Sequence, residues 1–257
     1  MTADIQVEQR GSVAAITISR PARRNALNGP AWMALRDGVR TVSDRPGIRA
    51  IILAGAEGHF CAGDDLKDSE LKLGGEAASR YATLIEETYS AILSAPQPVI
   101  AAISGACLGA GASIALHCDF RMADRTAKIG IPVSRIGDYY PPRLCRRLAL
   151  IAGMAMARRM LVIGDPVDGE TARACGLVDD LSTDAPATAE EFARTLATRA
   201  PLTTQSVKRV MEAILDGSFE RSLGDLGRLM DQVKCSQDRE EGRIAFLEKR
   251  PPKFKGV

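Results

Sequence analysis

Two segments rich in glycine and alanine constrain this chain more than any other feature. They read HFCAGDD at residues 59–65 and SGACLGAGAS at residues 104–113, and each follows a short apolar run typical of a buried strand. Small residues let the backbone approach a ligand closely, and a helix that opens at Ala110 leaves the N–H groups of its first turn free. Two loops that each direct one such donor at the same point would form an oxyanion hole.

Composition and charge exclude several classes of protein. The chain has 257 residues, of which 46% are hydrophobic and 26% charged, as in a globular protein with a large core. Its net charge of +2 argues against a broad nucleic-acid surface. Residues 99–116 carry no charge, but β-branched residues followed by small ones favour a strand, a turn and a buried helix over a membrane span. The N-terminal residues lack the apolar region of a signal peptide. We therefore expect a cytoplasmic protein that binds neither nucleic acid nor membrane.

The cysteines and histidines do not indicate a metal centre. The six cysteines form no C-x-x-C pair, and the two histidines have no partners at the spacing of zinc ligands. We expect reduced, mostly buried thiols and no bound metal.

Strands and helices alternate over most of the chain, which indicates an α/β fold. Strands are predicted near residues 5–9, 13–19, 49–53, 98–103, 120–122 and 177–179. Asn28 is expected to cap a helix that runs to about residue 43, and a second helix is predicted at residues 76–93. Only helices are predicted after about Asp184, at residues 187–199, 201–215, 219–234 and 239–249. The sequence therefore predicts a core at residues 1–184 and a helical region at residues 185–257 suited to packing on a neighbouring chain.

A series of motifs extends over nearly the whole chain. They are RPARRNALN (20–28), RAIILAG (49–55), the two glycine-rich segments, AKIGIPVSRIG (127–137), GDPVDGETARACGLVDDL (164–181) and FLEKRPPKF (246–254). Together they resemble the crotonase (enoyl-CoA hydratase/isomerase) superfamily. The resemblance implies a spiral of ββα units and C-terminal helices that assemble a homotrimer or homohexamer. It also implies an acyl-CoA thioester as substrate, so that coenzyme A enters as part of the substrate and no other cofactor is expected.

The resemblance also assigns site residues. It implies that the backbone N–H groups of Asp64 and Ala110 form the oxyanion hole. The side chain of Asp64 is expected to lie in solvent or to face CoA, and Asp65 is expected to tie down its loop. Contacts with CoA are implied for Arg24, Ala26, Ala62, Leu66 and Lys67. Phe246 and Lys249 are implied to touch the nucleotide end of CoA on a neighbouring subunit.

Two departures from the family pattern bear on the chemistry. Enoyl-CoA hydratases add water with two glutamates, and the matching positions here hold Ser113 and Val133. A positioned proton-transfer group contributes about 10² to 10⁴ in rate, whereas each oxyanion donor is worth roughly 2.7 to 4 kcal/mol. We therefore expect stabilisation of a thioester enolate to survive, and little or no hydration by the two-glutamate route.

The segment GDYYPPRL (137–144) supplies the nearest replacement groups. Tyr140 matches a tyrosine of methylmalonyl-CoA decarboxylase-like members of the superfamily. Asp138 is a candidate base for a double-bond isomerase, or for the activation of water in thioester hydrolysis. Alternatively, the segment is a proline-rich turn with an exposed aspartate and packed tyrosines, and the chain is a noncatalytic acyl-CoA binding protein. The candidate catalytic residues are thus Asp64, Ala110, Ser113, Asp138 and Tyr140.

Two other polar groups allow a functional and a structural interpretation. Ser113 and His117 share a helix face and Asp119 follows, but the surrounding GASIA departs from the G-x-S-x-G elbow of serine hydrolases. A packing serine and a satisfied histidine are favoured. For His59, a place on a surface loop is favoured over contact with substrate.

Overall fold

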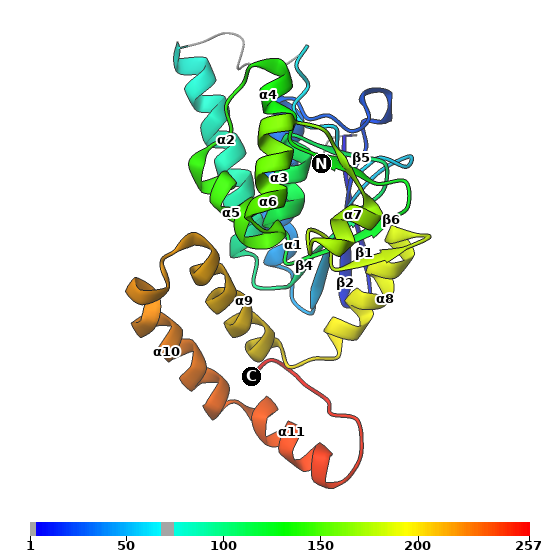
Figure 1. Ribbon diagram of the computed structural model, residues 1–257. Coiled ribbons are helices and arrows are strands. Elements are labelled where there is room, and N and C mark those ends of the chain that lie inside the picture. Colours follow the sequence, from blue (N-terminus) through cyan, green and yellow to red (C-terminus); the bar gives the residue numbers. More distant parts are fainter. Residues whose placement is uncertain (1–3, 68–74) are drawn as a thin grey trace.

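Six of the strands pair into one sheet of order β1-β2-β3-β4-β6-β9. The computed structural model describes residues 4–67 and 75–257 (Figure 1). β1 is antiparallel to β2, and the other neighbours are parallel. The strands are β1 (Ile5–Arg10), β2 (Val13–Ile18), β3 (Ala50–Gly55), β4 (Val99–Ile103), β6 (Phe120–Asp124) and β9 (Asp180–Ser182). A smaller sheet joins β5 (Ala106–Leu108), β7 (Lys128–Gly130) and β8 (Val167–Asp168).

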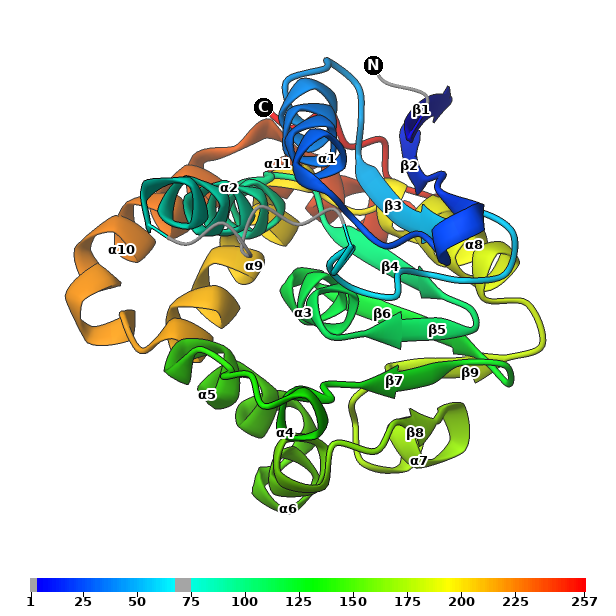
Figure 2. The same ribbon diagram turned by 90° about the horizontal axis from the view of Figure 1, so that it is seen from above.

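The larger sheet is covered on both faces, as its apolar strands require. Side chains alternate along β3: Ile51 and Leu53 join the cluster that holds Trp32, whereas Ala50 and Ile52 pack with Ala189 of α8 (Ala185–Ala197). Figures 1 and 2 show α1 and α2 on one side of the sheet and α8 on the other. The helical part of the chain after residue 184 therefore begins with a helix that packs on the sheet. The division between residues 184 and 185 stays a prediction.

The two long helices near the N-terminus are where the periodicity predicts them. Asn28 caps α1 (Gly29–Ser43) by accepting a hydrogen bond from the Ala31 N–H at 3.2 Å. The apolar face of α1 is fully buried, as is Ile92 of α2 (Gly75–Ser94). No described helix is both long enough and apolar enough to cross a membrane. The uncharged segment 99–116 forms β4 and most of α3 (Ala110–His117), as predicted, but residues 106–108 between them form the short strand β5, which the sequence pattern does not predict.

Shorter helices and turns connect these elements. They are a 3₁₀ turn η1 (Pro21–Arg23), α4 (Val133–Ile136), α5 (Pro142–Ala152), α6 (Met154–Arg158), a π-helical turn η3 (Arg159–Ile163) and α7 (Gly169–Ala174). The strand predicted at residues 177–179 is wrong by three residues, because β9 begins at Asp180. Leu177 and Val178 are apolar because they pack in the core in the turn before the strand.

Three helices at the C-terminus extend away from the sheet (Figure 1). They are α9 (Pro201–Asp216), α10 (Phe219–Cys235) and α11 (Gln237–Leu247). The chain then returns toward the core, where the Arg49 guanidinium donates a hydrogen bond to the Lys255 carbonyl at 2.9 Å.

Candidate functional site

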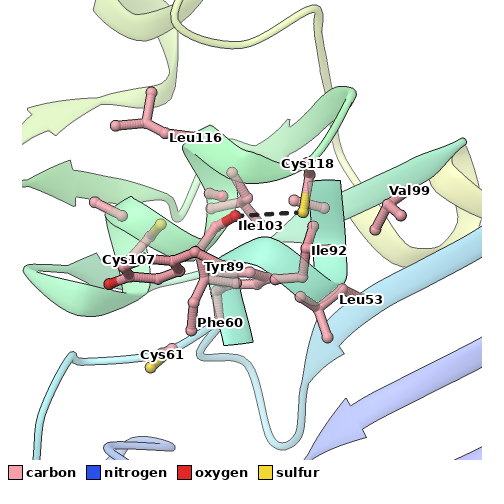
Figure 3. Packing of buried hydrophobic residues seen from close by; sticks show 14 of the residues in the cluster. Leu53, Phe60, Cys61, Tyr89, Ile92, Val99, Ile103, Cys107, Leu116 and Cys118 are labelled. Atoms are coloured by element: carbon pink, nitrogen blue, oxygen red, sulfur yellow. Dashed lines mark hydrogen bonds between the residues drawn. The ribbon is translucent and has the colours of Figure 1, made fainter. Parts of the chain in front are cut away.

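The two glycine-rich segments lie against each other at the start of α3. The backbones of Cys61 and Cys107 form an isolated parallel β-bridge. In it the Cys61 N–H donates to the Ala106 carbonyl and the Leu108 N–H donates to the Cys61 carbonyl, each at 2.9 Å. A Cβ on Gly111 would lie 2.1 Å from the Cys61 carbonyl oxygen, so only glycine allows this approach. Figure 3 shows Cys61 and Cys107 in the packed core with Tyr89. Burial raises the pKa of the Cys61 thiol to about 12, which keeps it from acting as a thiolate.

The backbone around Asp64 is held by Leu27 on one side. The Leu27 N–H bonds the Gly63 carbonyl and the Asp65 N–H bonds the Leu27 carbonyl, both at 2.8 Å. In such a bridge the N–H of Asp64 points away from Leu27. A Cβ on Gly63, whose φ is +103°, would lie only 3.4 Å from the Ala110 nitrogen. The Asp64 and Ala110 segments are therefore in direct contact.

Both N–H groups assigned to the oxyanion hole are without a protein acceptor in the part of the chain that the structure describes. Ala110 is the first residue of α3, and the ladder of that helix begins with the Ser113 N–H, which bonds the Gly109 carbonyl at 3.0 Å. Gly109 itself has a φ of +53°, a conformation that favours glycine. Two backbone donors from two adjacent loops thus remain available for a hydrogen bond to another molecule.

The side chain of Asp64 does not lie free in solvent, so this part of the sequence expectation is wrong. Its Oδ1 accepts hydrogen bonds from Trp32 Nε1 at 2.7 Å and from the Tyr81 hydroxyl at 2.9 Å. Both rings are buried, and Asp64 itself is half-buried. Burial raises the pKa of the Asp64 carboxyl, these two hydrogen bonds lower it, and the charge of Asp138 raises it further.

Hydroxyl and apolar groups stand at the two positions where the resemblance implies glutamates in hydratases. The Ser113 hydroxyl lies 2.9 Å from the Tyr140 hydroxyl and also donates to the Gly109 carbonyl at 3.3 Å. Ser113 is buried, and Val133 packs against the main core cluster. Burial is the main cause of the raised pKa of Tyr140, which keeps this phenol protonated. The structure therefore brings Ser113 and Tyr140 together beside the start of α3.

Asp138 lies in an exposed turn between α4 and α5. Its N–H bonds the Val133 carbonyl at 3.0 Å, and its carboxylate accepts a hydrogen bond from the Tyr139 N–H at 2.8 Å. The side chain is solvated, but its charge is close enough to act on the Asp64 carboxyl. The carboxylates of Asp64 and Asp138 are therefore close enough to repel each other.

The two histidines have structural partners, and no serine-hydrolase arrangement forms. His117 stacks on Tyr89 at a centroid distance of 4.3 Å, and its Nδ1 lies 2.6 Å from the Ser113 carbonyl rather than from the hydroxyl. Asp119 accepts one hydrogen bond from the Val99 N–H and is paired with Lys208. His59 is half-buried rather than on the surface, because its Nδ1 accepts the Ala106 N–H at 3.1 Å.

The residues that the resemblance assigns to CoA fall into two groups. The first group lies together, because the Ala62 N–H bonds the Arg24 carbonyl at 3.0 Å and the following residues of both segments stay paired. Within it, Ala26 is buried and Leu66 and Lys67 are exposed. Phe246 lies in the last turn of α11 and Lys249 two residues after that helix ends, and Figure 1 shows α11 away from the sheet. Phe246 is 83% exposed, so it is available to another chain.

Sequence reasoning missed Trp32 and Tyr81 as site residues. Both lie on the apolar faces of long helices, where a core interpretation is natural. Each touches Asp64 from a distant part of the chain, so no local spacing signals the contact.

Comparison with known proteins agrees with this architecture. The sequence profile described as enoyl-CoA hydratase/isomerase matches residues 8–257. A Mycobacterium tuberculosis protein called probable enoyl-CoA hydratase is 36% identical over 98% of this chain and 100% of its own length. The 2,3-dehydroadipyl-CoA hydratase of Escherichia coli is 29% identical over 98% of this chain and 99% of its own.

Solved structures confirm the crotonase-like α/β fold. An enoyl-CoA hydratase from Bacillus anthracis has a TM-score of 0.90 with 28% identity, over 99% of this chain and 100% of that one. An enoyl-CoA hydratase from Mycobacterium marinum has a TM-score of 0.87 with 30% identity, over 100% of both chains. The match extends from the sheet through the C-terminal helices. The chain therefore belongs to the enoyl-CoA hydratase/isomerase family.

Proposed function

We propose that this protein acts on an acyl-CoA thioester and stabilises its enolate with the N–H groups of Asp64 and Ala110. The observation that carries the proposal is the contact between two loops at Gly63 and Gly111, which leaves both N–H groups without a protein acceptor in the described residues. Donors fixed before the reaction need no reorganisation when charge develops on the thioester oxygen. Each such donor is worth roughly 2.7 to 4 kcal/mol.

The two-glutamate hydration of the family is not part of this proposal. Hydration needs a base that activates water and an acid that protonates the α-carbon. Ser113 is a buried hydroxyl bonded to Tyr140, and Val133 is apolar. Neither group ionises near neutral pH, so neither can replace a glutamate as the base or the acid of hydration.

The reactions open to such a site are those in which an enolate forms and is reprotonated. Tyr140 is a phenol held protonated by burial, so it suits donation of a proton to an enolate. Isomerisation of a double bond fits this chemistry. Decarboxylation and thioester hydrolysis use the same oxyanion hole and are alternative outcomes of the experiment below.

Substrate binding and assembly complete the proposal. The paired segments with Arg24, Ala26, Ala62, Leu66 and Lys67 would bind the CoA moiety. Phe246 and Lys249 would reach the nucleotide end of CoA on a neighbouring chain of a homotrimer or homohexamer.

The proposal is tested by incubating the protein with 2-enoyl, 3-enoyl, saturated, malonyl-type and aromatic acyl-CoA thioesters in deuterated water, followed by mass spectrometry. Deuterium at the α-carbon, double-bond migration, loss of carbon dioxide or release of free CoA each identifies one reaction. A variant with Asp138→Asn and Tyr140→Phe tests whether the loop after α4 takes part. Rapid addition of water would contradict the assignment of Ser113 and Val133, and unchanged thioesters would indicate an acyl-CoA binder without catalysis.

A further inference from the structure

The carboxylate of Asp64 belongs to the same residue as one of the two oxyanion donors. Covalent geometry keeps a carboxyl carbon within about 3 to 4 Å of its own backbone nitrogen. A thioester whose oxygen is bound by the Asp64 N–H therefore has its reacting carbons close to this side chain. No other carboxylate of the candidate site is tied so closely to the hole.

One oxygen of this carboxylate is fixed by two hydrogen bonds, and the other has no hydrogen-bond donor among the described residues. Oδ1 accepts hydrogen bonds from Trp32 of α1 and Tyr81 of α2, at 2.7 and 2.9 Å. Oδ2 accepts none from the residues that the structure describes, and Asp64 is partly exposed. Two buried rings thus orient the carboxylate and leave one basic lone-pair site, as a general base requires.

We propose that Asp64 is a catalytic residue whose Oδ2 removes the α-proton of a bound 3-enoyl-CoA thioester. This inference rests on the proposed function and adds the base that the positions of Ser113 and Val133 lack. The C–H electron pair forms the new C=C bond of a dienolate, and the thioester oxygen takes the negative charge against the Asp64 and Ala110 N–H groups. Asp64 becomes a neutral acid. Return of the proton to the γ-carbon gives the 2-enoyl-CoA thioester and restores the carboxylate.

The charge balance of this step favours one class of substrate. Proton abstraction moves a single negative charge from Oδ2 to the thioester oxygen, so the site never holds two new charges. A malonyl-type substrate would bring a second carboxylate beside Asp64, with Asp138 adding charge of the same sign. Like charges so placed in a partly buried site repel each other. The site therefore suits an acyl chain without a charge at the α-carbon.

The electrostatics also suit a base. Burial raises the pKa of Asp64, which makes the ionised carboxylate a stronger proton acceptor than a solvated aspartate. The competing interpretation is that Asp64 only satisfies Trp32 and Tyr81. That interpretation needs an acceptor at Oδ1 but no basic group at Oδ2, so one substitution separates the two.

Asp64→Asn keeps the backbone N–H and an acceptor oxygen for both rings and removes the base. Deuterium uptake by butyryl-CoA and isomerisation of a 3-hexenoyl-CoA probe are measured for the wild type and this variant, with melting temperature and butyryl-CoA binding as checks of folding. Asp165→Asn, at an exposed carboxylate paired with Arg135, is the matched control. We expect Asp64→Asn to lose about 10² to 10⁴ in both rates, as for removal of a general base, and Asp165→Asn to retain them.

The outcomes separate this inference from the proposed function. If Asp64→Asn exchanges deuterium and isomerises the probe at the wild-type rates, Asp64 is not the base, but the proposed enolate function is unaffected. Loss of both rates in the Asp138→Asn variant but not in Asp64→Asn assigns the base to Asp138 instead. A wild type that neither exchanges deuterium nor isomerises the probe overturns both.

Trp32→Phe provides a second test that does not depend on changing Asp64. It removes the Nε1 hydrogen bond that lowers the pKa of the carboxyl. The exchange rate rises with pH as the base ionises, so the midpoint of that rise should move to higher pH in Trp32→Phe. An unchanged midpoint overturns the assignment.

Discussion

Gly111 sets the distance between the two loops of the oxyanion hole. A Cβ at this position would lie 2.1 Å from the Cys61 carbonyl oxygen, which is backbone and cannot rotate away. We expect Gly111→Ala to cost about 1 to 3 kcal/mol of unfolding free energy, as overpacking does, and to lower α-deuterium exchange by separating Asp64 from Ala110. Denaturant unfolding and exchange rates provide the two readouts.

The matched control is Gly224→Ala on α10, where an added Cβ has no heavy atom within 4 Å. Replacing a helix glycine with alanine stabilises by about 0.5 to 1 kcal/mol. Equal effects of the two substitutions would show that the approach of the loops does not limit the site.

His117 gives the protein a specific dependence of stability on pH. Burial, with a smaller effect of the Arg147 charge, lowers its pKa from 6.5 to about 3. Between these two values the unfolded chain binds a proton that the folded chain does not, so the free energy of unfolding falls as pH falls below 6.5. The limiting slope of one such group is about 1.4 kcal/mol per pH unit.

His117→Phe keeps a ring against Tyr89 and removes the titrating group. We expect its free energy of unfolding, measured by denaturant titration at several pH values, to fall less steeply in acid than that of the wild type. Parallel curves for the two proteins would show that His117 is not kept neutral by the fold.

The partners of Asp64 mark the limit of what the sequence can predict at single residues. The sequence could locate the two glycine-rich segments, because a glycine where two backbones approach closely is required by the local backbone itself. The direction of the Asp64 side chain could not, since it depends on Trp32 and Tyr81, which two separate helices bring to it. Local spacing carries no information about such contacts.

The helices α5 and α9 are joined by an ion pair between the buried Arg147 and the half-buried Glu212. The Arg147 guanidinium binds Glu212 through two hydrogen bonds of 2.8 and 2.9 Å and donates a third to the Leu116 carbonyl at 2.6 Å. Glu212→Ala leaves a buried cation without its partner, and breaking a buried pair in this way costs about 3 to 5 kcal/mol. Denaturant unfolding measures the loss.

The comparison variant is Glu170→Ala, which breaks an exposed pair with Arg125. An exposed pair is worth about 1 kcal/mol or less. If both variants lost the same stability, the attachment of α9 to the core would not depend on Arg147.

Length decided which elements the sequence could predict. Long amphipathic helices such as α1 and α2 show several turns of apolar spacing, and their predicted bounds agree with the structure to within one or two residues. β5, β7 and β8 have two or three residues each, too few for a period to be visible. These short strands are stabilised by tertiary contacts, namely the backbone β-bridge between Cys61 and Cys107 and the pairing of β7 with β5 and β8.

At the scale of the whole molecule, the C-terminal helices expose apolar side chains that a single chain does not cover. The exposed apolar residues of α9, α10 and α11 include Val207, Met211, Ile214, Leu223, Phe246 and Leu247. Exposed apolar surface of this extent is typical of an interface between proteins. We expect it to be buried between copies of this chain, in agreement with the trimer or hexamer that the sequence motifs imply.

We expect Phe246 to link this assembly to catalysis, because the proposed contact of this residue is with CoA held by a neighbouring chain. With 83% of its surface exposed, Phe246→Glu should leave the fold of one chain intact, whereas a charge in an apolar interface should shift the protein toward monomers in light scattering. If the neighbouring CoA site loses a contact, the KM for an acyl-CoA substrate rises more than kcat falls. Phe246→Tyr retains the ring and should keep both the assembly and KM. A Phe246→Glu protein with wild-type mass and KM would place both the interface and the nucleotide contact elsewhere on the chain.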